Sequence, residues 1–251
     1  MEKSPSDQTL INNTFYETLG SMWYAGQDHP IALLRAENQV RVPWVIETIH
    51  KNFSRKIDLL DIGCGGGLLT NPAALAGHRV SGIDLSLNSL EIAQQFDTTK
   101  SVHYLTANAN LLPFNASSFD VVTAMDILEH VENPDKLIEE ASRVLRPGGL
   151  FFFHTFNRNV LSYLVIIKGV DWFVKNAPRN MHVYDLFIRP KELEALCLSH
   201  KLQVNELLGF SPKICHTAFW KLLLQRKVPS DFRFQFTKSC LIGYSGFAKR
   251  T

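Results

Sequence analysis

A glycine-rich turn follows a short apolar run in the stretch LLDIGCGGGLLT, residues 59–70. Glycine lets the backbone turn tightly and approach a ligand closely, and two ligand classes use such a turn after a first strand: dinucleotides and S-adenosylmethionine. The dinucleotide pattern G-x-G-x-x-G needs a third glycine, but reading from Gly63 meets Leu68 there and reading from Gly65 meets Thr70. The turn therefore lacks the dinucleotide fingerprint.

Two carboxylates near this turn bear on the same choice. Asp61 precedes Gly63 by two residues, and its charge would attract the ammonium group of S-adenosylmethionine but repel a pyrophosphate. Asp84 ends the segment VSGID, where a carboxylate can accept both hydroxyls of a ribose from either ligand. We therefore predict S-adenosylmethionine as the ligand, with contacts from Asp61, Gly63, Gly65 and Asp84.

Polar side chains also follow the next two predicted strands. Asn108 comes after SVHYLTAN, where its side-chain carbonyl could accept the adenine amino group or could form an Asx-type turn. Asp126, Glu129 and His130 stand in AMDILEHV, at offsets that let them converge if the backbone turns helical there. They could serve the acceptor site or only orient loops, and the sequence leaves both readings open.

A regular succession of elements must position these side chains. Residues 10–50 indicate two helices, one around Asn12–Trp23 and one from Ile31 to Lys51 with an interruption at Pro43. From Lys56 on, predicted strands (IDLLDIG, RVSGIDLS, SVHYLTAN, FDVVTAMDIL, LFFFHTF) alternate with predicted helices (NPAALAGH, SLNSLEIAQQF with Ser86 as N-cap, NPDKLIEEASRVL). This alternation predicts a parallel sheet with helices on both faces.

The alternation is interrupted after Phe156. Residues 157–185 form an insert, followed by a helix in RPKELEALCLSH, a strand in KLQVNELLGF, an irregular apolar stretch in HTAFWKLLLQRK and a closing strand in KSCLIGYSGFAKR. We expect that closing strand to be an antiparallel edge. The prediction is a Rossmann-like α/β fold with a mostly parallel seven-stranded sheet, helices on both faces and a helical insert before the last strands.

Four segments follow one another within residues 56–156: DIGCGGG, GID, ANANLLPF and RVLRPGG. The ordered set resembles the class I S-adenosylmethionine-dependent methyltransferases. Three further blocks, DILEHV, TFNRN, and His182 with FIRP, are similar to those of the ubiquinone-biosynthesis O-methyltransferases, which methylate ring hydroxyls of polyprenylated phenols and catechols. That second resemblance runs over roughly residues 12–250.

The resemblance implies an enzyme that methylates a polyprenyl phenol or catechol in ubiquinone biosynthesis, of the 2-polyprenyl-6-hydroxyphenol or 3-demethylubiquinol type. It implies cofactor contacts at Arg41, Gly63, Asp84 and Met125. It also implies a divalent ion, Mg²⁺, at Asp126, Glu129 and His130. Such a metal would lower the pKa of a ring hydroxyl and hold the phenolate in line with the sulfonium methyl.

Methyl transfer from a sulfonium needs orientation and a deprotonated nucleophile. His130 and His182 are the candidate catalytic bases, although a single histidine is more often structural. Two other functions stay open: methylation of another small aromatic or lipid acceptor by the same fold, and a catalytically silent protein that binds S-adenosylmethionine.

A single methyltransferase domain is expected over residues 1–251. Its parts are N-terminal helices (1–55), a cofactor-binding core (56–156), an insert for the acceptor site and membrane (157–185) and a segment that completes the sheet (186–251).

The net charge of +2 hides an uneven distribution. Residues 1–150 hold 11 Lys/Arg and 18 Asp/Glu, whereas residues 151–251 hold 15 and 6. The basic half predicts an anionic partner, with a solvated basic face as the alternative, but no basic run is dense enough to indicate nucleic acid. Two apolar-basic segments, 160–175 and 218–227, could lie on a membrane surface or pack on the sheet.

Compartment signals are few. The first residues, MEKSPSDQ, lack the apolar core of a secretory signal, and no run approaches the ~20 apolar residues of a spanning helix. Cys64, Cys197, Cys215 and Cys240 show no disulfide or metal spacing. We expect reduced thiols in a cytoplasmic protein that can contact the inner face of a membrane.

Overall fold

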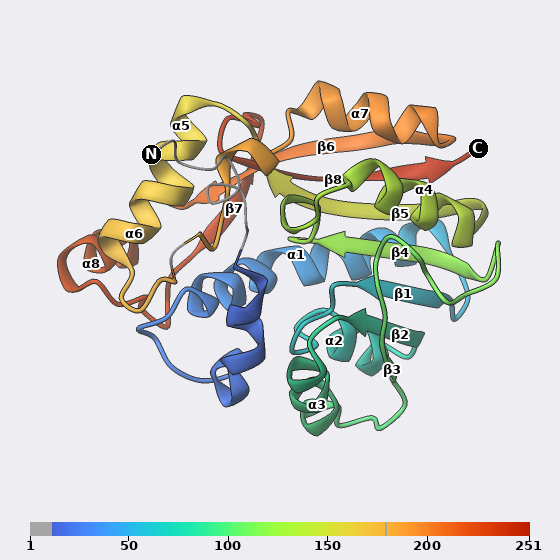
Figure 1. Cartoon of the computed structure of the whole chain (residues 1–251), viewed down its shortest axis with the longest axis horizontal. Coiled ribbons are helices and arrows are strands. Elements are labelled where there is room, and N and C mark those ends of the chain that lie inside the picture. The colour runs from blue at the N-terminus through green and yellow to red at the C-terminus, as the bar shows by residue number, and fades with distance from the viewer. Residues whose placement is uncertain (1–11, 179) are drawn as a thin grey trace, which may run out of the picture.

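One eight-stranded sheet runs through the computed structural model, which describes residues 12–178 and 180–251 (Figure 1). The strand order is β3-β2-β1-β4-β5-β8-β6-β7. The strands are β1 (Asp58–Ile62), β2 (Arg79–Asp84), β3 (His103–Thr106), β4 (Phe119–Met125), β5 (Leu145–Phe156), β6 (Leu202–Pro212), β7 (Phe234–Thr237) and β8 (Gly243–Arg250). Neighbouring strands from β3 to β5 are parallel, as the alternating sequence predicts.

The far side of the sheet corrects two expectations. The described residues form eight strands rather than seven, because the short segment Phe234–Thr237 forms β7 at the edge. The closing strand β8 is antiparallel, as expected, but lies inside the sheet between β5 and β6. Its first four residues are all buried, because neighbouring strands and helices cover it; its sequence alone does not distinguish this from a half-covered edge.

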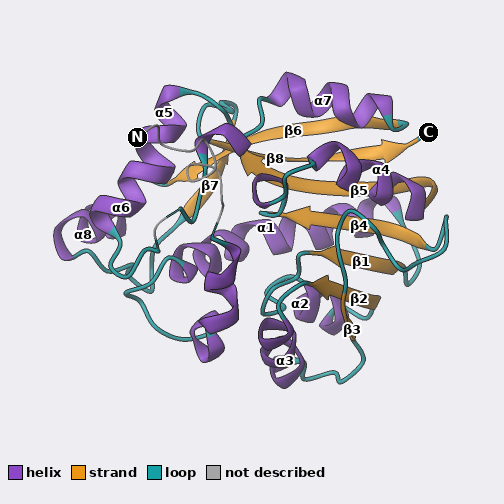
Figure 2. Cartoon of the chain, viewed as in Figure 1, coloured by secondary structure: helices purple, strands orange, loops and turns teal. Residues whose placement is uncertain are grey.

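Helices cover both faces of the sheet (Figure 2). Helices α1 (Ile31–Asn52) and α2 (Thr70–Leu75) pack on one face, where Val45 and Ile49 join the core around Phe152. Helices α4 (Pro134–Val144) and α7 (Pro190–Ser199) pack on the other, where Leu137 and Leu193 join the core around Phe151 and Phe153. Helix α3 (Leu87–Phe96) begins as predicted, because the Ser86 side chain accepts a hydrogen bond from the Ser89 amide at 3.1 Å.

Three local predictions were wrong. Helix α1 continues through Pro43, because Pro43 and Gln39 lie on its exposed side, where solvent can replace the lost backbone hydrogen bond. The segment around Asn12–Trp23 forms two 3₁₀ turns, Asn13–Thr18 and Gly20–Trp23, and Gly20 begins the second with a φ of +51°. The stretch HTAFWKLLLQRK contains a regular helix, α8 (Thr217–Gln225).

The insert is helical, as predicted. It contains α5 (Val160–Ser162), a π-helical turn (Tyr163–Lys168) and α6 (Gly169–Phe173), and α6 lies beside α8 at one end of the molecule (Figure 1). A separate apolar core joins this end, with Val174, Phe210, Leu222 and Phe232 among its buried members. Within the described residues, no helix is both long enough and apolar enough to cross a bilayer. The stretch MEKSPSDQ, for which no secretory signal is expected, lies outside them.

Candidate functional site

A cavity of about 260 Å³ opens at the carboxyl ends of β1, β2 and β4. Gly63, Gly65, Asp84 and Asn108 all line it, so four predicted cofactor contacts lie on one cavity. The carboxylate of Asp84 accepts hydrogen bonds from the amides of Gly65, at 2.8 Å, and Ser86, at 2.9 Å. These contacts fix Asp84 at the cavity wall and leave lone pairs on both oxygens for a ligand.

The glycines at this turn are required by its geometry. Gly63 and Gly65 have φ values of +70° and +50°, and a Cβ atom at Gly63 would lie 2.8 Å from Cδ1 of Ile127. A Cβ atom at Gly65 would run into the ring of Trp23, which covers the turn from the N-terminal 3₁₀ segment. The turn is therefore enclosed on the side away from the sheet.

Asp61 and Met125 line a smaller adjoining cavity of about 60 Å³ together with Gly63. The hydroxyls of Thr70 and Thr123 each donate to the Asp61 carboxylate at 2.6 Å. Burial raises the pKa of Asp61 to about 6, against the lowering effect of those hydroxyls.

Asn108 combines the two roles that the sequence leaves open. Its side-chain oxygen accepts the amide hydrogen of Asn110 at 2.8 Å, which is an Asx turn. The same residue lines the cofactor cavity, so the turn holds the side chain at the wall.

Arg41 lies behind the cavities rather than on their walls. Its guanidinium is completely buried, and its Nη1 and Nη2 atoms donate to the two oxygens of Asp126 at 2.7 and 2.6 Å. Arg41 does not line these two cavities, whereas Asp126 lines both of them and also a third, apolar cavity. Burial alone would raise the pKa of Asp126, but Arg41 outweighs it and the pKa is lowered.

An apolar cavity of about 320 Å³ lies on the other side of Asp126. We name it the acceptor cavity, and the two cavities above the cofactor cavities, after the ligands that the sequence predicts. The insert contributes walls such as Leu164, Val170 and Phe173, and α8 contributes Phe219 and Leu222. Its polar end is formed by Tyr16, Glu37, Asp126, His130 and His182. A long apolar molecule with one polar end would match this distribution.

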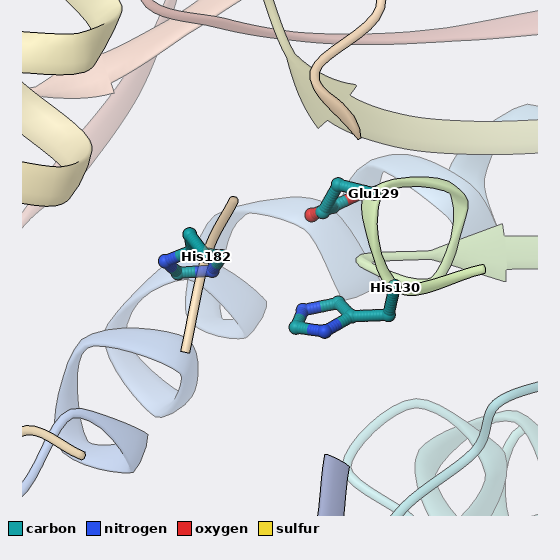
Figure 3. A group of neighbouring side chains, drawn as sticks. All are labelled: Glu129, His130 and His182. Atoms are coloured by element: carbon teal, nitrogen blue, oxygen red, sulfur yellow. The ribbon is translucent and has the colours of Figure 1, made fainter. Parts of the chain in front are cut away.

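Glu129, His130 and His182 lie close together (Figure 3), and the two histidines line that polar end. Glu129 and His130 come from a 3₁₀ turn after β4, Leu128–His130, and His182 comes from the insert. One ligand atom from each lies within 4.8 Å of the others, and the two imidazole ring centres are 5.5 Å apart. The structure therefore gathers two of the three predicted metal ligands with His182, whereas Asp126 is paired with Arg41.

Burial controls the charges of this cluster. It raises the pKa of Glu129 to about 8, with the nearby charge of Asp126 adding to the effect. It lowers the pKa of His130 to about 4 and that of His182 to about 3, so both imidazoles are neutral at pH 7. Among the described residues, neither Oε1 of Glu129 nor Nδ1 of His130 has a hydrogen-bond partner. A divalent cation binds oxygen and nitrogen atoms of this kind, and both are free to act as its ligands.

A second group of titratable side chains adjoins the same cavity. Ligand atoms of Glu37, Asp126 and His154 lie within 4.8 Å of one another. The Nε2 atom of His154 is 3.6 Å from Oδ1 of Asp126, and its Nδ1 atom is 2.8 Å from the hydroxyl of Ser245. Arg41 already supplies a positive charge to this group, which disfavours a metal ion there.

Sequence reasoning missed Tyr16, Trp23, Glu37 and His154. Tyr16 lines the acceptor cavity and both cofactor cavities, and its hydroxyl lies 3.5 Å from Nε2 of His130. No spacing in TFYETLGSMW marks these aromatic residues. Glu37, four residues before Arg41 on α1, carried a usable signal: a carboxylate one turn from a predicted cofactor-binding arginine.

Comparison with known proteins shows which family the chain belongs to. A ubiquinone biosynthesis O-methyltransferase from Aromatoleum aromaticum is 40% identical over 69% of this chain and 74% of its own length. A protein of the same name from Haemophilus ducreyi is 33% identical over 82% of this chain and 89% of its own length. The chain belongs to the ubiquinone biosynthesis O-methyltransferase family. A family model described as a methyltransferase domain also matches residues 60–153.

Solved structures place this family member in the class I methyltransferase fold. Magnesium protoporphyrin IX methyltransferase from Synechocystis, solved with bound SAH, aligns over 96% of both chains with a TM-score of 0.65 and 17% identity. A methyltransferase structure from Bacillus halodurans aligns over 83% of this chain with a TM-score of 0.60 and 17% identity. The predicted fold class is confirmed.

Proposed function

We propose that this protein transfers the methyl group of S-adenosylmethionine to a ring hydroxyl of a polyprenylated phenol or catechol in ubiquinone biosynthesis. One observation supports this best: an apolar cavity ends at a polar cluster, and Asp126 separates that end from the cofactor cavities. A polyprenyl tail would occupy the apolar part and place its ring beside the methyl donor. Family membership supports the same reaction.

The cofactor roles follow the walls of the two cofactor cavities. We assign the ribose to Asp84, the adenine side to Asn108, and the methionine end to the small cavity formed by Asp61, Gly63 and Met125. Gly65 lets the backbone approach the ligand. Arg41 acts through Asp126, whose carboxylate it holds in place. Preorganised contacts of this kind align donor and acceptor for displacement.

We also propose a divalent cation at Glu129, His130 and His182, with His182 replacing Asp126 in the predicted ligand set. When bound there, the ion would lower the pKa of a ring hydroxyl. One carboxylate and two neutral imidazoles suit Zn²⁺ or Fe²⁺ better than Mg²⁺, which prefers oxygen donors. The low pKa values of both histidines make them weak free bases, which favours roles as ligands or hydrogen-bond acceptors.

A methyl-transfer assay tests this function. The purified protein should convert a short-chain prenyl catechol to its monomethyl ether in the presence of S-adenosylmethionine and a divalent cation, releasing one S-adenosylhomocysteine per product. Mass spectrometry measures both products. The same acceptor with both hydroxyls already methylated is the control. Cofactor binding without methyl transfer, with each of several cations, would contradict the proposal.

The end of the molecule that holds the acceptor cavity is also our proposed membrane contact. Trp172 of α6 is 56% exposed although it also touches the cavity, and Leu224 of α8 is 84% exposed although other residues of its helix line the cavity. Lys168 ends the π-helical turn directly before α6, and Lys221 lies on α8. An apolar surface bordered by basic side chains can lie in the headgroup region of an anionic bilayer. A prenylated acceptor could then enter from the membrane.

Replacing Trp172 and Leu224 together with serine should weaken binding to anionic vesicles at least about tenfold, because two large apolar side chains no longer enter the bilayer. Vesicle sedimentation measures the partition coefficient. Leu198→Ser is the matched control, because Leu198 is 70% exposed on α7, away from the cavity. Equal partitioning of the double variant and the control would reject this surface.

A further inference from the structure

Glu37 brings a carboxylate to the acceptor cavity from a direction that the predicted site does not include. It lies on α1 and is only 8% exposed, and it lines the polar end of the cavity together with Asp126, His130 and His182. Asp126 is the other carboxylate that lines this end, and Glu129 lies beside it in the cluster with the two histidines. Glu37 therefore adds a separate acidic group to the apolar cavity.

The Glu37 carboxylate has unused hydrogen-bonding capacity. Its single ion pair joins Oε2 to Nη2 of Arg41 at 3.2 Å. The same Nη2 atom lies closer to Asp126, at 2.6 Å, and the remaining terminal nitrogen, Nη1, also donates to Asp126. Within the described part of the chain, Glu37 has no other polar partner. Burial raises the pKa of Glu37 to about 8, against the lowering effect of Arg41. Whether or not it carries a proton, the group keeps free acceptor positions, so a buried one with a single shared contact needs a further donor.

The chemistry of the cavity limits what that donor can be. A metal ion at Glu37 would lie next to the Arg41 guanidinium and be repelled. The cavity walls are largely apolar: among the lining residues of the insert and α8, Trp172 and His182 carry a side-chain N–H, and neither is hydrogen-bonded to Glu37. A catechol brings two neighbouring O–H groups on one ring. One can be placed at the Glu129–His130–His182 cluster for methylation, which leaves the other free to donate.

We propose that Glu37 is a specificity-determining residue: its carboxylate accepts a hydrogen bond from the acceptor's second ring hydroxyl and so favours catechols over monophenols. This inference rests on the proposed function. A site built to bind a hydroxyl rejects the analogue that lacks it, because the buried acceptor is then left unpaired. The hydroxyl keeps its proton throughout, so Glu37 orients the ring and takes no part in bond making.

The test compares kcat/KM for a short-chain prenyl catechol and for the matching monophenol, at saturating S-adenosylmethionine. In Glu37→Leu the ratio of catechol to monophenol should fall about ten- to hundredfold. Glu37→Gln retains a carbonyl acceptor of the same shape, so its ratio should lie between those of Glu37→Leu and the wild type. Glu47→Gln is the matched control, since Glu47 is an exposed residue of the same helix, paired with Lys51. The control should keep the wild-type ratio.

An unchanged ratio of the two kcat/KM values in Glu37→Leu, whether both fall equally or neither falls, would overturn the proposal. An equal fall for both acceptors would show that Glu37 is only a structural partner of Arg41. If the leucine variant does not fold, dissociation constants of the two acceptors for the wild-type protein in EDTA replace it. There the catechol should bind tighter, and equal affinities would overturn the proposal. A wild-type protein that methylates neither acceptor would instead refute the proposed function itself.

Discussion

Replacing Arg41 with methionine should destabilise the protein by about 3–5 kcal/mol, because it leaves the Asp126 carboxylate without its buried partner. Arg41 is completely buried and bonds both oxygens of Asp126. For a chain of this size that loss lowers the melting temperature by roughly 6–20 °C. Differential scanning calorimetry at pH 7 measures it.

The pH dependence of this loss has a definite sign. Burial raises the pKa of Asp126, but Arg41 outweighs burial and holds this pKa below its ordinary value. The pair therefore contributes stability at neutral pH, and this stability is lost as pH falls through the lowered pKa. In the variant, burial without Arg41 raises that pKa, and Asp126 takes up a proton at a higher pH. The difference between variant and wild type should therefore shrink as pH falls toward 4.

Two further variants make the Arg41 result specific. Arg41→Met combined with Asp126→Asn should recover part of the stability, because no unpaired charge remains and asparagine tolerates the φ of +59° at position 126. Arg55→Met is the matched control: Arg55 also forms a two-bonded pair, with Asp120, but its side chain is 56% exposed. A melting-temperature change in the control as large as that of Arg41→Met would count against the buried-charge explanation.

Glu129→Gln should lower kcat at least about a hundredfold, because loss of the carboxylate weakens the proposed cation site, and the cation would supply several kcal/mol of charge stabilisation at the acceptor oxygen. The dissociation constant for S-adenosylmethionine should change by less than about threefold, since Glu129 does not line either cofactor cavity. Steady-state kinetics and calorimetric titration separate these two effects.

A neighbouring carboxylate provides the comparison for Glu129. Glu132 is exposed, three residues further along, so Glu132→Gln should retain full kcat. Equilibrium dialysis measures the affinity for a divalent cation. This affinity should be lower in Glu129→Gln and unchanged in Glu132→Gln. Unchanged turnover in both variants would remove Glu129 from the acceptor site.

The part of the sheet that local sequence patterns determine could be predicted. Strands β1 to β5 each end in a glycine, proline or polar turn, and the helices between them have periodic apolar faces, so both position and direction follow from the sequence. The place of β8 was not predictable. Its pairing with β5 and β6 joins residues about ninety apart and residues about forty apart, and no local pattern records such pairing.

The site divides in the same way. Asp84 and the glycines follow a known turn directly, and the structure places them on one cavity. The joining of His182 to Glu129 depends on how a long insert folds back over the sheet, which spacing cannot show. Arg41 shows the limit of such reasoning. The resemblance implies a cofactor contact at Arg41, but its burial and its pairing with Asp126 depend on the tertiary structure and cannot be seen in the sequence.

The internal place of β8 has a consequence for synthesis of the chain. Eighty-six residues lie between Phe156, which ends β5, and Gly243, which begins β8. At about 5–20 residues per second, the open edge of β5 emerges from the ribosome several seconds before the strand that pairs with it. During that interval β5, with its run of phenylalanines, is an unpaired apolar edge of the kind that aggregates or recruits chaperones. The growing chain is thus most vulnerable after the cofactor-binding half has been made and before β8 pairs with β5.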